Sequence, residues 1–315
     1  MTPLVVVLGP TATGKSELAV ELALRLGGEI VSADSVQVYK YLDIGTARIT
    51  PRQQKGVPHH LLGFLEPDEE FTVARFQQLA RSIIAEIGAR SRLPFLVGGT
   101  GLYIQAVIDP YEFPSHHGLE AVRKQLQSFV ETGRGAELYA ELQRIDPEAA
   151  RRIHPHDHHR LIRALEVYSL TRRPISSYQA KETAPSPEYD LAMIGLDRNR
   201  AELYRRIDLR VEKMFREGLV DEVRQLLGRG FESGLKPLQT LGYRQVIAYL
   251  AGEHDLASAI SLTKQATRKY AKRQLTWFRR DPRIRWFTLT EETGPEIVCD
   301  EIVEYICRSI PVHVE

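Results

Sequence analysis

The chain has 315 residues, a length typical of about two domains. Its 43% hydrophobic and 26% charged residues exclude a disordered or fibrous protein. The longest apolar runs are far shorter than the roughly 20 residues that cross a bilayer, and the start lacks the basic segment of a signal peptide. Cys299 and Cys307 form neither a disulfide framework nor a metal-ligand pair, which predicts a cytoplasmic protein.

The first hundred residues alternate between short apolar runs and segments with helical spacing. We expect strands at residues 4–8, 29–32 and 95–97, and helices at residues 17–26 and 71–87. Strands separated by helices imply right-handed crossovers and a parallel sheet that is covered on both faces. The pattern therefore predicts an α/β fold.

Two further strands are expected much later, at residues 191–196 and 284–289. The sequence between the first hundred residues and the strand expected at 191–196 contains helical patterns at residues 121–130, 135–144 and 160–170. A Pro/Ser/Thr-rich stretch at 174–187, typical of a loop, follows them. We therefore predict a catalytic core formed by residues 1–110 and 190–315. Residues 111–189 are predicted to form a helical insertion domain.

The net charge of +1 conceals a strongly basic segment. No acidic residue lies between Asp255 and Asp281, and the cations of this segment are Lys264, Arg268, Lys269, Lys272, Arg273, Arg279 and Arg280. Aromatic residues are interleaved with them, and Lys264, Arg268 and Lys272 fall on one helical stripe, where like charges repel. An ordinary solvated helix face is the alternative, but uncompensated charge of this kind favours contact with a phosphate backbone.

A phosphate-binding loop follows the first predicted strand. Its eight residues match G-x-x-x-x-G-K-[ST] at every position and are Gly9, Pro10, Thr11, Ala12, Thr13, Gly14, Lys15 and Ser16. Its backbone N–H groups and the following helix N-terminus attract phosphate, Lys15 adds a cation, and the Ser16 hydroxyl can ligate Mg²⁺. We therefore predict a P-loop NTPase-like sheet flanked by helices. Asn199 is the only asparagine, so no N-K-x-D guanine-reading motif exists; a small-molecule kinase remains open.

Two polar segments follow the other early strands, at the sheet edge where α/β proteins bind ligands. Asp34 can serve as an outer-shell metal partner or as a general base, and its structural alternative is a helix cap or turn former. Residues 98–101, Gly-Gly-Thr-Gly, can let a ring or ribose approach the backbone, or form only a turn. Position alone does not decide between these roles.

These motifs together resemble the bacterial tRNA dimethylallyltransferases. The matching stretches are GPTATGKS at 9–16, SADSVQVYKYLDIGTA at 32–47, PHHL at 58–61, VGGTGLY at 97–103, DPEAARRIHPHDHHRLIRALE at 146–166, LDRNRAELYRRI at 196–207, LGYRQVIAYLAG at 241–252 and TRKYAKRQLTWFRRD at 267–281. Two departures are Gly63, where the family tends to have aspartate, and His156, where it usually has asparagine.

The resemblance implies transfer of a dimethylallyl group from dimethylallyl diphosphate to the exocyclic N6 amine of the adenine on the 3′ side of the anticodon. The P-loop would bind the diphosphate, with Lys15, Mg²⁺ and an arginine, here assigned to Arg206, stabilising its developing charge. Asp34 would accept the proton of the amine. Thr100 would contact the tRNA near the flipped base, which Ser35, Val36 and Gln37 would line.

The same resemblance implies that the anticodon stem-loop is held by the insertion and by the basic helix, in a monomeric enzyme. Contacts are expected from Arg123, His159, Arg160, Leu161, Ile162, Arg163, Arg268 and Lys272. Arg160 and Arg163 share a helical face, and pairing with Glu166 is the alternative to phosphate contact. Two other function classes stay open, a kinase and an enzyme that prenylates a free adenine nucleotide.

Histidine-rich segments look like metal sites but are predicted to be structural. The run from His154 to His159 lacks a second ligand cluster, so we interpret it as a helix-entry loop in which Asp157 caps the helix. His59 and His60 are expected to be structural or to line the substrate site.

Overall fold

Alternating side chains of strand β1 enter two different cores, because both faces of the sheet are buried. Val5 and Val7 lie in one apolar cluster, and Leu4, Val6 and Leu8 lie in the other. In this computed structural model, which describes residues 1–315 except 112, 114–118, 179–187, 291–294 and 312–315, β1 lies inside a six-stranded sheet with the order β3-β2-β4-β1-β5-β6. Every neighbouring pair in this sheet is parallel.

The strands agree with the predicted α/β class, and one of them was not predicted. They are β1 (Thr2–Leu8), β2 (Gly28–Ala33), β3 (His59–His60), β4 (Leu93–Gly98), β5 (Tyr189–Asp197) and β6 (Arg285–Thr288). Strand β3 has only two residues, too few to show an apolar period in the sequence. The parallel sheet predicted from the sequence is confirmed.

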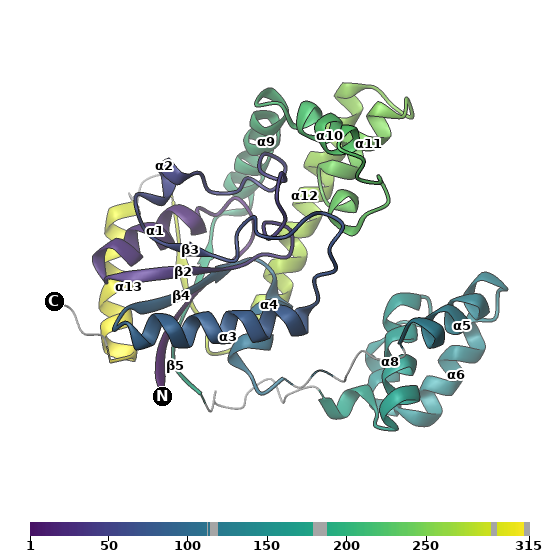
Figure 1. Cartoon of the computed structure of the whole chain (residues 1–315). Helices are drawn as coiled ribbons and strands as arrows, with labels where there is room; N and C mark the ends of the chain where they lie inside the picture. The colour runs from purple at the N-terminus through teal and green to yellow at the C-terminus, as the bar shows by residue number, and fades with distance from the viewer. Residues whose placement is uncertain (112, 114–118, 179–187, 291–294, 312–315) are drawn as a thin grey trace. The chain divides into compact units, whose positions relative to one another are not determined.

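Helices cover both faces of the sheet (Figure 1). On one face pack α1 (Lys15–Arg25) and α13 (Pro295–Ser309), through residues such as Leu22 and Ile302. On the other pack α3 (Val73–Ala89) and α4 (Gly101–Ile108), through residues such as Phe76 and Ile104. The carboxyl ends of β1, β2 and β4 therefore open into the loops that carry the predicted motifs.

Further helices follow β5, and those between residues 200 and 250 enclose a third apolar cluster, which includes Val38 and Leu42 from the segment after β2. These further helices are α9 (Arg200–Arg216), α10 (Leu219–Gly228), α11 (Tyr243–Leu250), α12 (Leu256–Phe278) and the 3-10 turn Lys236–Gln239, and the short helix α2 (Pro51–Gln54) lies earlier in the chain. Helix α12 contains most of the basic segment and contacts α9 and α11.

The chain divides into two units, one formed by Met1–Ile108 with Pro185–Glu315 and one by Asp109–Ala184. The second is helical, with a core around Leu142 and Leu161. Its elements are α5 (Leu119–Glu131), α6 (Gly135–Ile145), α7 (Pro147–Arg152), α8 (His158–Thr171) and the 3-10 turn Ile175–Tyr178. The remainder of the loop predicted at 174–187 lies outside the described residues.

None of the helices in the described ranges is both long enough and apolar enough to span a membrane.

Candidate active site

The P-loop connects β1 to α1, and its conformation depends on glycine. Gly9 has a φ of 143° and Gly14 a φ of 101°, both in the region that favours glycine. A Cβ at Gly9 would lie 2.5 Å from the carbonyl oxygen of Leu196 in β5. Within the loop, the Thr13 hydroxyl donates to the Pro10 carbonyl at 2.9 Å. These features fold the loop tightly at the start of α1, as the motif predicts.

Lys15 is held over the loop and has a strongly perturbed charge. Its Nζ donates to the Pro10 carbonyl at 2.7 Å. The pKa of Lys15 is lowered to about 7, mainly by burial and also by the positive charge of Arg210, while Asp34 partly opposes the shift. The ammonium and its neighbouring guanidinium thus form a concentrated positive region, which is suited to an anionic ligand.

Arginines of the β5–α9 region also contact the P-loop. Arg206 Nε donates to the Ala12 carbonyl at 2.9 Å, and Arg198 Nε donates to the Thr13 carbonyl at 2.9 Å. Arg210, one helical turn after Arg206, donates through Nη2 to the Thr46 carbonyl at 3.3 Å. Its pKa is lowered by burial. Sequence reasoning selected Arg206 and missed Arg210, although the spacing of four residues places both on one helical face.

Asp34 directly follows β2 and is both a turn former and an available carboxylate. Its Oδ1 accepts the backbone N–H of Val36 at 2.8 Å and of Gln37 at 3.2 Å. In the described part of the chain, Oδ1 carries all the hydrogen bonds of this carboxylate. The turn orients the side chain, and Oδ2 accepts no hydrogen bond from the described residues. The two interpretations of Asp34 are therefore compatible.

Helix α12 contributes a residue that sequence reasoning missed, Gln274. Its Oε1 accepts the backbone N–H of Thr11 at 2.9 Å, and its Nε2 donates to the Gly99 carbonyl at 2.9 Å. One buried amide thus joins the P-loop to the loop after β4. The neighbouring Tyr270 hydroxyl is hydrogen bonded to Thr100, and burial raises the pKa of Tyr270 to about 12.

A cavity of about 400 Å³ lies where these loops meet. Of the predicted diphosphate residues, it is lined by Thr11, Lys15 and Ser16. From the segment after β2 it is lined by Asp34, Ser35, Val36 and Gln37, and from the helices by Arg210, Tyr270, Arg273 and Gln274. The predicted catalytic and diphosphate-binding residues that do not line it are Gly9, Pro10, Ala12, Thr13, Gly14, Thr100 and Arg206. The cavity therefore combines a phosphate-binding loop with a carboxylate and an amide side chain.

Comparisons with known proteins identify the family. The model of the IPP transferase family matches residues 37–281, and that of the isopentenyl transferases matches residues 2–62. A tRNA dimethylallyltransferase of Moorella thermoacetica is 48% identical, with 99% of this chain and 98% of that protein aligned. The chain belongs to the IPP transferase family. The resemblance predicted from the motifs is confirmed.

Solved structures of similar proteins agree. The full-length tRNA isopentenylpyrophosphate transferase of Bacillus halodurans is 43% identical, with a TM-score of 0.73 and 98% of both chains covered. A eukaryotic dimethylallyltransferase acting on tRNA is 26% identical, with a TM-score of 0.81, and is matched over 100% of this chain and 82% of its own. The predicted P-loop α/β fold is therefore the fold of this family.

The basic segment of this family member is partly neutralised, which corrects the expectation of uncompensated charge. Arg268 forms a two-pronged ion pair with Asp208 of α9, and Lys264 pairs with Glu212 at 2.5 Å. Arg279 pairs with Asp197 at 2.9 Å. A count along the sequence misses these acids because α9 brings them to α12 through tertiary packing. Among the described residues, Lys272 is exposed and has no acidic partner.

In the insertion, all three predicted tRNA-contacting arginines form ion pairs. Arg123 binds Glu166 through two hydrogen bonds, at 2.5 and 3.0 Å, and Arg163 lies 3.4 Å from the same buried carboxylate. Arg160 instead lies 3.4 Å from Asp157. Pairing with Glu166, the alternative to phosphate contact, is thus observed for Arg163, whereas Arg160 pairs with a different carboxylate. Contact of any of these arginines with tRNA stays a prediction.

The neighbouring residues of α8 differ in exposure. Leu161 and Ile162 are buried in the core of the second unit, so their side chains stabilise packing, and His159 is exposed. Asp157 accepts the N–H of Arg160 at 3.2 Å and caps α8, which confirms the predicted cap.

The paired histidines of β3 have separate roles. His60 Nε2 lies 2.8 Å from Glu29 Oε2, a structural contact, whereas His59 lines the cavity. Burial lowers the pKa of His59, which favours its neutral form. Of the two departures from the family pattern, Gly63 has a φ of 56° and lies against the guanidinium of Arg48. His156 is exposed in the loop before α8.

Proposed function

We propose that this chain transfers a dimethylallyl group from dimethylallyl diphosphate to the N6 amine of the adenine on the 3′ side of the anticodon in tRNA, with release of diphosphate. The observation that supports this most is the shared cavity, in which Lys15 and Ser16 of the P-loop lie with Asp34 and Gln37. This arrangement suits both a donor that carries a diphosphate leaving group and an adenine amine that must lose a proton.

The diphosphate of the donor occupies the P-loop. The allylic carbon–oxygen bond breaks and its electron pair leaves with the diphosphate, so negative charge grows on the phosphate oxygens. Lys15 and Arg210, which both line the cavity, stabilise that charge together with the loop N–H groups. Arg206 supports the loop through the Ala12 carbonyl. We also propose that Arg206 contacts the diphosphate directly, as predicted from the sequence.

The N6 amine attacks the allylic carbon and forms the new nitrogen–carbon bond. This amine is a weak nucleophile because its lone pair is delocalised into the purine ring, so removal of its proton is needed. Asp34 Oδ2 takes that proton, while the two N–H bonds to Oδ1 hold the carboxylate in place. The side chains of Ser35, Val36 and Gln37 surround the adenine, and Thr100 contacts the tRNA close to it.

Mg²⁺ fits the oxygen donors of this cavity. The Ser16 hydroxyl lines it and is the residue proposed to hold the ion, together with diphosphate oxygens and water. When bound, Mg²⁺ supplies charge neutralisation to the leaving diphosphate. Ser16 is exposed at the start of α1, so its hydroxyl is accessible for ligation.

The tRNA is proposed to bind as an anticodon stem-loop, with phosphate contacts from exposed cations of α12 and of the insertion, to a monomeric enzyme. Lys272 is proposed for this role because it is exposed and has no acidic partner among the described residues, a property that it shares with Lys269 and Arg280. Base chemistry requires the adenine to leave its stack and enter the cavity.

The decisive experiment supplies unmodified tRNA, labelled dimethylallyl diphosphate and Mg²⁺, with parallel reactions containing AMP as acceptor or γ-labelled ATP as donor. The proposal requires label in tRNA and none in AMP. Label transferred from ATP to an acceptor would instead identify a kinase. Asp34→Asn is the matched variant, because it keeps the side-chain volume and the turn but removes the base.

A further inference from the structure

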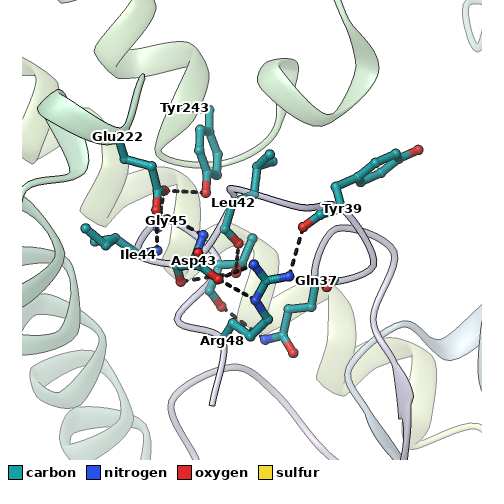
Figure 2. Close-up of polar contacts among 10 residues, drawn as sticks. Gln37, Tyr39, Leu42, Asp43, Ile44, Gly45, Arg48, Glu222 and Tyr243 are labelled. Carbon is teal, nitrogen blue, oxygen red and sulfur yellow. Dashed lines mark hydrogen bonds and ion pairs between the residues drawn. The ribbon is translucent and has the colours of Figure 1, made fainter. Parts of the chain in front are cut away.

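The segment between β2 and α2 carries the predicted adenine pocket. It has hydrogen bonds of its own, such as that from the Ala47 N–H to the Ile44 carbonyl at 2.9 Å, and it is also held by contacts from other elements. Tyr41 has a φ of 65° and Ala47 a φ of 47°, conformations that side chains other than glycine rarely adopt. Such strain persists only where surrounding structure imposes it. Figure 2 shows polar contacts that hold the residues between these two positions and beside them.

A single carboxylate on α10 binds three consecutive backbone amides of this segment. Glu222 Oε2 accepts the N–H of Asp43 at 2.9 Å and of Ile44 at 2.7 Å, and Oε1 accepts the N–H of Gly45 at 3.0 Å. The hydroxyl of Tyr243 donates to the same Oε1 at 2.7 Å. Four donors therefore converge on Glu222 (Figure 2).

Packing reinforces this anchor. Tyr243 is fully buried, and a Cβ at Gly45 would lie 2.5 Å from its ring. The backbone of Gly45 thus lies directly against the aromatic ring, with no room for a side chain between them. On the other side of the segment, Arg48 pairs with Asp43 and donates to the carbonyls of Gln37 at 3.1 Å and Tyr39 at 2.9 Å.

The anchored amides lead directly to two side chains of the cavity. The next residue, Thr46, presents its carbonyl to Gln37 Nε2 at 3.1 Å and to Arg210 Nη2 at 3.3 Å. Gln37 belongs to the predicted adenine pocket, and Arg210 lies beside Lys15. One carbonyl therefore sets the orientation of a base-facing amide and of a phosphate-facing guanidinium.

We propose that Glu222, supported by Tyr243, is a positioning residue for the transfer reaction: it holds residues 43–45 so that Thr46 orients Gln37 and Arg210. This rests on the proposed function, and it extends it to residues that lie outside the motifs of the P-loop and of Asp34. Glu222 does not line the cavity, so it acts through the segment and not on substrate.

Glu222→Gln tests this with little change of volume. An amide has one oxygen, so its NH₂ group must face two of the four donors whichever way it is turned. We expect kcat/KM for tRNA to fall about 10²-fold, with a raised KM for tRNA, because displacement of about 1 Å has effects of this size. Tyr243→Phe removes one hydrogen bond and should lower kcat/KM about fivefold. The control is Asp221→Asn, an exposed neighbour on α10 that pairs with Arg224.

A double-mutant comparison separates positioning from general stability. If Glu222 acts through Gln37, Glu222→Gln should cost less than about tenfold in a Gln37→Ala background. A cost that stays about 10²-fold in both backgrounds, unchanged kinetics of Glu222→Gln, or a fall in kcat that the smaller folded fraction measured by urea unfolding accounts for in full, each overturns the inference. Tyr243→Phe provides the same test if Glu222→Gln does not fold. If the wild-type chain itself transfers no label to tRNA, the proposed function fails, and the inference falls with it.

Discussion

Replacement of Gln274 by methionine should destabilise the α/β unit measurably. The change keeps the side-chain length but leaves the Thr11 N–H and the Gly99 carbonyl without their partner. An unsatisfied buried group costs roughly 1–3 kcal/mol. Both backbone groups are only half-buried, so water can recover part of the loss, and we expect about 2–3 kcal/mol in total.

Intrinsic fluorescence during urea unfolding measures this effect specifically. The chain has two tryptophans, Trp277 and Trp286, and both belong to the α/β unit. Gln265→Met is the control, because Gln265 is exposed on the same helix and its replacement should stay within about 0.5 kcal/mol. Equal unfolding midpoints for the two variants would refute the view that Gln274 joins the two loops. The KM for dimethylallyl diphosphate should also rise in Gln274→Met, since Thr11 belongs to the P-loop.

Three other outcomes are expected. Asp34→Asn should lower kcat about 10²–10⁴-fold with nearly unchanged tRNA affinity, and wild-type turnover would exclude its role as base. Because the pKa of Lys15 is lowered to about 7, kcat/KM for dimethylallyl diphosphate should fall as pH rises above that value, and Lys15→Arg should abolish this inflection; a wild-type profile flat to pH 9 would contradict it. The slope of log K against log salt for tRNA binding should weaken by about one unit in Lys272→Glu. It should weaken by less in Arg268→Glu, because the guanidinium of Arg268 is already paired with Asp208 in the wild-type chain. Equal slopes for the two variants would refute this.

The lowered pKa of Lys15 also predicts the sign of a stability effect. Between pH 7 and the ordinary lysine value of 10.5, the unfolded chain binds more protons at this position than the folded one. The free energy of unfolding of the ligand-free protein should therefore rise with pH in that window. In Lys15→Met this contribution should disappear, which denaturation at pH 7 and pH 9 can measure. An unchanged pH dependence in that variant would show that Lys15 is not the titrating group.

The parts of the site that could be predicted from sequence are those whose geometry is local. The P-loop follows from the order strand, glycine-rich turn and helix, and Asp34 follows from its place at the end of a strand. The parallel sheet carries both to one edge without further information. Strand β3 was missed because a two-residue strand has no period, and α4 was missed because its start lies within a segment interpreted as a glycine turn.

The parts that could not be predicted depend on contacts between distant residues. Gln274 lies 263 residues from its partner Thr11, and Glu222 lies 177 residues from Gly45. Neither has a feature in the sequence that separates it from other exposed-looking helix residues. The charge of α12 was misjudged for the same reason, because Asp208 and Glu212 belong to another helix.

These distant contacts have a common consequence for how the site is built. The motif residues come from the first hundred positions, whereas the side chains that orient them come from α9, α10 and α12. Helix α12 also carries Lys272, which is proposed to contact tRNA. A shift of α12 on tRNA binding would therefore be transmitted through Gln274 to both the P-loop and the loop after β4. If this connection operates, bound tRNA should lower the KM for dimethylallyl diphosphate in the wild-type enzyme and have less effect in Gln274→Met.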